Sequence, residues 1–254
     1  MTLSDDQLDR YARHIILHDV GGAGQARLMA ARVLVIGVGG LGAPVLMYLA
    51  AAGVGAGSGA LGFVDFDEVD LSNLQRQIIH TTKTVGIRKT ESAAEMIKAL
   101  NPDINVEAHD VKLTAENAAD IISSYDIVAD GTDSFETRFI INRACVETGT
   151  PLVSAAVGQF DGQIATFKGY DKALPCYQCF VTEAPPAGAA PSCAEAGVLG
   201  ALTGVLGSLQ ALEIMKEIIG IGDSLAGRLM IYDGLGAQVR TVRLPKDPDC
   251  PVCG

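Results

Sequence analysis

Two patterns of apolar and polar positions alternate along the N-terminal part of the chain. Short apolar runs rich in β-branched residues predict buried strands, and segments with apolar residues every three or four positions predict helices. Strands are predicted at 32–36, 61–65, 105–108 and 126–129, and helices at 41–52, 88–100, 115–124 and 135–148. Strands that alternate with helices form a parallel sheet with right-handed crossovers.

The pattern changes after Pro151. Strands are predicted from there at 152–157, 163–168, 229–232 and 238–244, and short glycine turns between them favour antiparallel pairing. We therefore predict an α/β fold built on a Rossmann-like mixed sheet, with a parallel N-terminal half, antiparallel additions in the C-terminal half and helices on both faces. The length of 254 residues fits a single domain, 1–254.

Two flanking segments have their own signatures. Ser4 followed by Gln7 fits a capping box, so an amphipathic helix is predicted at 4–17. The segment 183–192 is rich in Pro, Ala and Gly and is predicted to be a flexible surface loop.

The uncharged stretch 196–212 carries Gly200 and Gly204 at G-x-x-x-G spacing. It is too short and too interrupted by polar residues for a membrane span. We predict a buried helix packed closely against a neighbour, within the core or across a subunit interface.

Composition and charge narrow the class of protein. Hydrophobic residues make up 48% of the chain, which excludes disorder, and the net charge of −11 argues against nucleic acid as a partner. Residues 1–10 include four charged side chains and lack the apolar core of a signal peptide. No membrane association is expected, and a cytoplasmic location is predicted.

A glycine turn follows the first predicted strand. Gly37, Gly39 and Gly42 stand in G-x-G-x-x-G order before a helix, whose N-terminus would bind phosphates. Asp65 ends the next predicted strand, where a carboxylate binds a ribose hydroxyl in dinucleotide-binding folds. These features alone also suit a nicotinamide-dependent oxidoreductase, or a turn that binds no ligand.

A group of polar residues further along favours a triphosphate. Asn73, Arg76 and Lys89 follow Asp65, and Asp133 follows the strand at 126–129. A triphosphate requires cations near its oxygens and a divalent metal held by a carboxylate. The alternatives are a solvated surface for the two cations and a helix cap for Asp133.

Four of the six cysteines form two C-x-x-C pairs, Cys176 with Cys179 and Cys250 with Cys253. Four thiolates fill the coordination sphere of a tetrahedral zinc ion, which would then be structural and would attach the tail 245–254 to the fold. Disulfides and redox chemistry are the alternatives, and a cytosolic location disfavours disulfides. Cys145 follows the apolar rhythm of a helix and is expected in the core.

Several motifs occur in a fixed order along almost the whole chain. They are Arg10-Tyr11-x-Arg13-His14-Ile15, Gly37-Val38-Gly39-Gly40-Leu41-Gly42, Asp65-Phe66-Asp67, Leu71-Ser72-Asn73-Leu74-Gln75-Arg76-Gln77, Gly86-x-x-Lys89 and Thr132-Asp133. With this set the chain resembles the adenylating enzymes of the MoeB, ThiF and HesA family, relatives of the ubiquitin-activating enzymes.

The resemblance implies an adenylyltransferase that uses ATP and Mg2+. Its substrate would be the C-terminal glycine of a small β-grasp sulfur-carrier protein, and its products an acyl-adenylate and pyrophosphate. The carrier would be MoaD-like, the molybdopterin synthase small subunit of molybdenum cofactor biosynthesis, or ThiS-like, from thiamin synthesis. The motif at 10–15 and the run Cys193-Ala194-Glu195-Ala196-Gly197 favour the MoeB branch. A catalytically silent half of a split activator is a further alternative, and intact Arg76, Lys89 and Asp133 argue against it.

The resemblance also assigns roles to residues. The catalytic set would be Arg13, supplied by the partner of a homodimer, with Asn73, Arg76, Lys89 and Asp133, which holds magnesium. The nucleotide would contact Gly37, Gly39, Gly40, Gly42, Asp65, Asp67, Ser72, Asn73, Gln75, Arg76, Lys89, Asp133 and Ser134. Cys193 would be a reactive thiol or an inert exposed one. A separate sulfur donor protein is expected, because a sulfurtransferase domain seen in some relatives does not follow Gly254.

Overall fold

The computed structural model describes residues 3–185 and 196–254. Within these ranges eight strands form one sheet in the order β3-β2-β1-β4-β5-β6-β7-β8. The strands are β1 (Arg32–Ile36), β2 (Ala60–Val64), β3 (Val106–His109), β4 (Ile127–Asp130), β5 (Leu152–Val157), β6 (Asp161–Phe167), β7 (Arg228–Asp233) and β8 (Gln238–Arg243). Pairs from β3 to β5 are parallel and pairs from β5 to β8 are antiparallel, which confirms the predicted mixed sheet.

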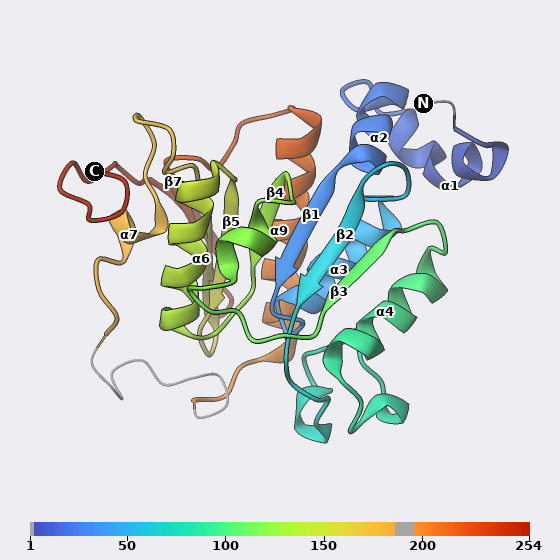
Figure 1. Ribbon diagram of the computed structural model, residues 1–254, viewed down its shortest axis with the longest axis horizontal. Helices are drawn as coiled ribbons and strands as arrows, with labels where there is room; N and C mark the ends of the chain where they lie inside the picture. Colours follow the sequence, from blue (N-terminus) through green and yellow to red (C-terminus); the bar gives the residue numbers. More distant parts are fainter. Residues whose placement is uncertain (1–2, 186–195) are drawn as a thin grey trace.

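Helices cover both faces of this sheet (Figure 1). One face carries α1 (Asp5–Ile15), α2 (Gly21–Ala30), α3 (Gly42–Ala51), α4 (Lys89–Leu100) and α9 (Gly200–Ile219). The other face carries α5 (Ala118–Ile122), α6 (Phe135–Thr148) and α7 (Tyr177–Phe180). Val33 and Val35 of β1 face the first layer, and Leu34 and Ile36 face the second, as the side-chain alternation of a strand requires. Two short 3-10 helices, η1 (Leu71–Asn73) and η2 (Thr82–Thr84), lie between β2 and α4.

The N-terminal helix α1 begins with the predicted capping box. The Ser4 hydroxyl accepts a hydrogen bond from the Gln7 amide, and the Gln7 side chain accepts one from the Ser4 amide. The helix ends at Ile15, two residues before the predicted end. Tyr11 anchors it to the core, and its hydroxyl accepts a hydrogen bond of 2.9 Å from Asn101.

The element boundaries differ from the predictions mainly in two places. Helix α5 covers 118–122 rather than 115–124, and β6 begins at Asp161 rather than at 163. Helix α2 was not predicted, because it begins Gly-Gly-Ala-Gly and glycine is a poor helix former.

The predicted helix at 196–212 is α9, which begins at Gly200 and continues to Ile219. It is only partly buried, since Leu212 has 51% of its surface exposed. The close helix contact is not made by the G-x-x-x-G pair. A Cβ at Gly207 would lie 2.3 Å from Pro44 Cγ of α3, whereas one at Gly204 would meet none of the described atoms within 4 Å. No helix in the described parts of the chain is both long and apolar enough to span a membrane.

This difference predicts opposite effects of the same substitution at two positions of α9. Gly204→Ala is expected to leave the free energy of unfolding unchanged or to raise it by up to about 1 kcal/mol, because alanine favours helix. Gly207→Ala is expected to lower it by about 1 to 3 kcal/mol, because the new methyl group overlaps Pro44. Urea unfolding of both variants measures the two values. Equal effects at the two positions would contradict the contact described for Gly207.

Candidate functional site

The glycine turn connects β1 to α3, and its two ends, Gly37 and Gly42, both require glycine. Gly37 has a φ of +91°, a left-handed conformation that favours glycine. A Cβ at Gly42 would lie 1.8 Å from the carbonyl oxygen of Gly37. The chain therefore reverses tightly over the end of β1, and the amino end of α3 faces the space beyond the sheet.

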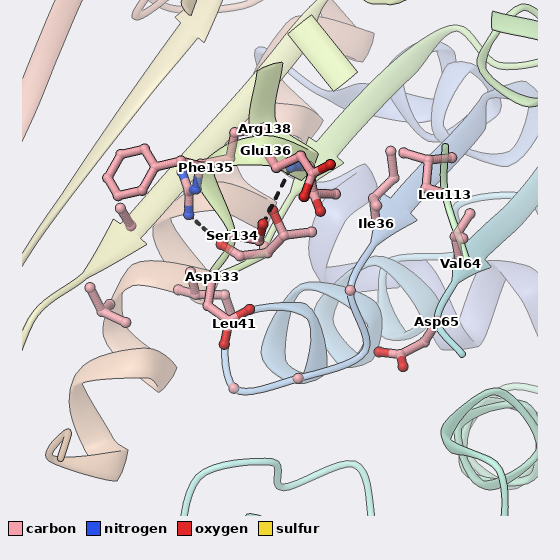
Figure 2. A pocket seen from close by; sticks show the side chains of 18 of the residues that line it. Ile36, Leu41, Val64, Asp65, Leu113, Asp133, Ser134, Phe135, Glu136 and Arg138 are labelled. Carbon is pink, nitrogen blue, oxygen red and sulfur yellow. Dashed lines mark hydrogen bonds between the residues drawn. The ribbon is translucent and has the colours of Figure 1, made fainter. Parts of the chain in front are cut away.

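A cavity of about 990 Å3 opens at this edge, where the parallel strands β1, β2 and β4 end. Figure 2 shows Asp65 and Asp133 reaching it from either side of the glycine turn. Open α/β sheets bind their ligands at the carboxyl ends of such strands. Nine of the predicted nucleotide-site residues line the cavity: Gly37, Gly39, Gly40, Asp65, Asp67, Arg76, Lys89, Asp133 and Ser134.

Asp65 links the end of β2 to the glycine turn. Its Oδ2 atom accepts a hydrogen bond of 2.8 Å from the Val38 amide, and Oδ1 accepts one of 2.9 Å from the Asp67 amide. Each carboxylate oxygen has a second lone pair, so Asp65 can also accept a hydrogen bond from a ligand hydroxyl. On the other side of Val38, buried His80 donates from Nε2 to the Val38 carbonyl oxygen over 3.1 Å. Burial of this ring lowers the pKa of His80 and keeps the imidazole neutral at pH 7.

Lys89 supplies a cation held in a fixed position. It is the first residue of α4 and is buried, and its Nζ lies 2.8 Å from Oδ2 of the more exposed Asp67. The Lys89 amide also donates to the Asp67 carbonyl oxygen, so the two residues are joined twice. Arg76 adds a second cation, positioned by a hydrogen bond of 3.0 Å from Nη1 to the Ser72 carbonyl oxygen.

Five predicted site residues do not line the cavity that the described residues form: Arg13, Gly42, Ser72, Asn73 and Gln75. Gly42 shapes the turn instead. Ser72 and Asn73 close the 3-10 turn η1: Asn73 Oδ1 accepts from the Asp70 amide, and the Ser72 amide and hydroxyl donate to Asp70. These bonds from Ser72 lower the pKa of Asp70.

Asp133 and Ser134 precede α6, where the sequence allows a helix cap or a metal ligand. Ser134 is the N-cap, since its hydroxyl accepts a hydrogen bond from the Thr137 amide. The exposed carboxylate of Asp133 makes no hydrogen bond or ion pair with any described residue. Nearby Asp130 is buried and accepts hydrogen bonds from Thr132 and Ser154. Of these two aspartates, Asp133 is the one with an exposed carboxylate that could accept a metal ion.

The predictions missed Arg138 and the apolar half of the cavity. Buried Arg138 donates to the carbonyl oxygens of Thr132 and Ala155 and forms an ion pair with Asp130, with 3.4 Å between Nη1 and Oδ2. Phe135, Tyr177 and Phe180, which we name the aromatic wall, line the side of the cavity formed by α6 and α7. A buried arginine has no motif of its own, and isolated aromatic residues are typical of any core. Gln77 also lines the cavity and stands in the predicted motif, but no role was assigned to it.

Arg13 does not line the cavity that the described residues of its own chain form. It is an exposed residue of α1, and α1 packs at the end of the sheet opposite to the carboxyl ends of β1 and β2 (Figure 1). Ile16 and Leu17, which follow it, are exposed by 70% and 52%.

The two C-x-x-C pairs come together in one cluster. The four Sγ atoms of Cys176, Cys179, Cys250 and Cys253 lie within 4.8 Å of one another. The Cys176–Cys250 and Cys179–Cys253 distances are 3.6 and 3.4 Å, much longer than a disulfide bond of about 2.05 Å. Four sulfurs around a zinc ion at about 2.3 Å would stand about 3.8 Å apart, so the donors fit this metal.

The remaining cysteines have different positions. Cys145 is buried in the core as predicted, and burial raises the pKa of its thiol. Cys193 and residues 186–192 of the predicted loop lie outside the described residues.

The fold and the cavity together define the class, a Rossmann-like α/β protein with carboxylates and cations around the glycine turn that follows β1. The sequence profile of the ThiF family matches residues 11–252, and the chain belongs to this family. It is accordingly an adenylyltransferase, as the motifs predicted.

Three named adenylyltransferases and activating enzymes align over 98 to 100% of this chain. It is 49% identical to the sulfur carrier protein adenylyltransferase of Thermus thermophilus, of which it covers 93%. It is 47% identical to the SAMP-activating enzyme E1 of Haloferax volcanii, of which it covers 92%. It is 48% identical to the probable adenylyltransferase/sulfurtransferase MoeZ of Mycobacterium tuberculosis, over 98% of this chain and 63% of that protein.

Solved structures share the fold. E. coli MccB with MccA-N7isoASN superposes with a TM-score of 0.84 at 21% identity, over 98% of this chain and 76% of that one. PaaA superposes with a TM-score of 0.81 at 21% identity, over 96% of this chain and 76% of that one.

Proposed function

We propose that this enzyme uses ATP to adenylate the C-terminal glycine of a small β-grasp sulfur-carrier protein. One observation carries the proposal: a single cavity combines the glycine turn and Asp65 with Arg76, Lys89 and Asp133, which has no partner among the described residues. A nicotinamide-dependent oxidoreductase would account for the first two features alone. The names of the relatives from Thermus thermophilus and Mycobacterium tuberculosis support the adenylation of a carrier.

The reaction needs alignment and charge stabilisation more than acid or base catalysis. The substrate carboxylate is already ionised, and its oxygen attacks the α-phosphorus of ATP. An O–P bond forms, the bond from the α-phosphorus to the bridging oxygen breaks, and pyrophosphate leaves. Fixed cations such as Lys89 and Arg76 stabilise the charge that develops on the phosphate oxygens.

The remaining residues position the nucleotide. Asp65 would accept hydrogen bonds from the ribose, and Gly39 and Gly40 would lie against the nucleotide. Mg2+ held by Asp133 would neutralise charge on the phosphates. Asn73 accepts from the Asp70 amide through Oδ1, so a contact with a phosphate oxygen would come from the Nδ2 donors of the same carboxamide.

The carrier we propose is MoaD-like, the small subunit of molybdopterin synthase, and a ThiS-like carrier is the alternative. The motif at 10–15 supports the first choice. Sulfur would come from a separate donor protein. A cytoplasmic location fits the use of ATP and the four unpaired sulfurs of the cysteine cluster.

We also propose a homodimer with two shared sites. Arg13 does not line the cavity formed by the described residues of its own chain, and its helix α1 packs at the opposite end of the sheet, so a role in catalysis requires a second subunit. The exposed apolar side chains of Ile16 and Leu17 beside it suit an interface.

Loss of either cavity cation should reduce adenylation strongly. Arg76→Ala and Lys89→Ala are each expected to lower the rate of carrier-dependent exchange of labelled pyrophosphate into ATP by about 100 to 1000 fold, because one preorganised contact to the phosphates is lost. Arg88→Ala is the matched control, since Arg88 precedes Lys89 but pairs with Asp110 outside the cavity. Near-normal exchange in the first two variants would refute their assigned roles, and no exchange by the unchanged enzyme with any carrier would refute the function.

Mixing two inactive variants tests the shared sites. Arg13→Ala subunits lack the donated arginine, and Asp133→Ala subunits lack the metal ligand. In a mixed dimer one site carries both defects, while the other has an intact Asp133 and receives Arg13 from its neighbour. Activity should therefore return to roughly one active site per mixed dimer, as the two-fold symmetry requires. If the subunits exchange and the mixture stays inactive, Arg13 does not act across the interface.

The cysteine cluster should hold one structural zinc ion. Cys250→Ser is expected to lower the melting temperature and the zinc content together, because metal binding contributes directly to the folding free energy. Elemental analysis of protein purified without chelator measures the content. Cys145→Ser is the control, because it changes a buried cysteine outside the cluster and should leave the zinc content intact. Absence of zinc from the unchanged protein would contradict the assignment.

A further inference from the structure

Helix α7 belongs both to the cysteine cluster and to the cavity. It begins directly after Cys176 and contains Cys179, and two of its four residues, Tyr177 and Phe180, form most of the aromatic wall. A single helical turn has too few hydrogen bonds to be stable by itself. Its position therefore depends on the groups that hold its two ends.

Asn142 of α6 binds the first end of α7 on two sides. This buried carboxamide donates from Nδ2 to Cys176 Sγ over 3.5 Å, and its Oδ1 accepts a hydrogen bond of 2.8 Å from the Tyr177 amide. Cys176, the residue before α7, provides no side-chain cap, so Asn142 supplies the missing one. The Asn142 side chain thus connects the Cys176 sulfur of the cluster to Tyr177 of the wall.

Ring packing connects Tyr177 to Phe180 of the wall and to two further aromatic residues outside it. The Tyr177 ring lies 5.9 Å from the ring of Phe139, 5.6 Å from that of Phe167 and 6.5 Å from that of Phe180. The guanidinium of Arg138, which donates to Thr132, lies 6.0 Å from the same ring. A shift of Tyr177 would therefore move the apolar half of the cavity.

We propose that Asn142 is a positioning residue, which fixes α7 against the cysteine cluster and so sets the part of the cavity that binds the acceptor chain next to its carboxylate. The occupant of this part rests on the proposed function. The wall is apolar and aromatic, which suits a peptide backbone with small side chains better than a phosphate. The cluster then does more than attach the C-terminal tail, because it determines how well the acceptor binds.

Asp65 and Lys89, which we assign to the nucleotide, are held independently of α7. Asp65 and Lys89 come from β2 and α4, and their hydrogen bonds run to Val38 and Asp67. A loosened α7 should thus weaken binding of the acceptor and spare that of the nucleotide. General damage to the fold would weaken both.

Two variants of Asn142 separate its two hydrogen bonds. Asn142→Ala removes both, and Asn142→Asp keeps an acceptor for the Tyr177 amide but loses the donor to Cys176. Cys145→Ala is the matched control, since Cys145 is a buried residue of the same helix outside the wall and the cluster. The measurements are the zinc content, the Kd of a non-hydrolysable ATP analogue, and kcat and KM for a MoaD-like carrier in pyrophosphate exchange.

Asn142→Ala is expected to raise KM for the carrier about tenfold, the factor that corresponds to about one lost hydrogen bond, with kcat and the Kd of the analogue within about twofold of the control. Asn142→Asp should recover most of the affinity for the carrier. An unchanged KM, or an equal loss in KM, kcat and analogue binding, would overturn the proposal. Should Asn142→Ala fail to fold, Phe180→Ala tests the wall itself, because this half-buried side chain lines the cavity and is not a ligand of the cluster. It too should raise KM selectively, and an unchanged KM would overturn the role of the wall.

Hydrogen exchange tests the positioning without any carrier. Amide protection across 177–181 should fall in zinc-loaded Asn142→Ala and remain in Cys145→Ala, while residues of α4 keep their protection in both. If the unchanged enzyme activates no carrier, the proposed function fails, but this measurement still decides the role of Asn142. Equal protection of 177–181 in both variants would overturn it.

Discussion

The contact between Gly37 and Gly42 is the constraint on which the site depends. With a Cβ at Gly42 only 1.8 Å from the Gly37 carbonyl oxygen, no other residue lets the chain turn this tightly between β1 and α3. The turn brings the Val38 amide to Asp65 and the Val38 carbonyl to His80. The end of β2 and the segment before α4 are thereby tied to the end of β1, and their side chains converge on one cavity.

Two halves of the cavity have different physical origins. One half is polar and is built from strand ends and helix starts whose backbone groups are held by hydrogen bonds, with the buried Lys89 paired to Asp67. The other half is apolar and is held by aromatic packing on α6 and α7. A buried arginine, Arg138, lies between them and satisfies the carbonyl oxygens of Thr132 and Ala155. The reaction we propose needs both halves, because a charged nucleotide must meet the end of a peptide chain.

Much of the fold and of the polar half could be predicted from the sequence. The alternation of apolar runs and helical patterns indicates the parallel part of the sheet, and parallel strands place their following residues, such as Asp65 and Asp133, at one edge. The cysteine pairs likewise come together as their spacing suggested. Helix α2 was missed because its glycines obscure the helical pattern, and Gly207 was missed because the spacing of small residues does not say which one meets a neighbour. Arg138 and Asn142 could not be recognised, since a polar residue in a helix is usually exposed, and their burial is decided by tertiary packing.

The cysteine cluster also affects the order in which parts of the protein can fold. The sulfurs that approach each other belong to residues 74 positions apart, and α9, β7 and β8 lie between them. Closing so long a segment costs chain entropy, and it becomes favourable once these elements have docked on the sheet. The glycine turn and its partners lie much nearer to one another along the chain, so they can meet without waiting for the C-terminal strands. We therefore expect the apolar half to be the last part of the cavity to acquire its shape, so that a chain with a formed polar half still lacks the aromatic wall.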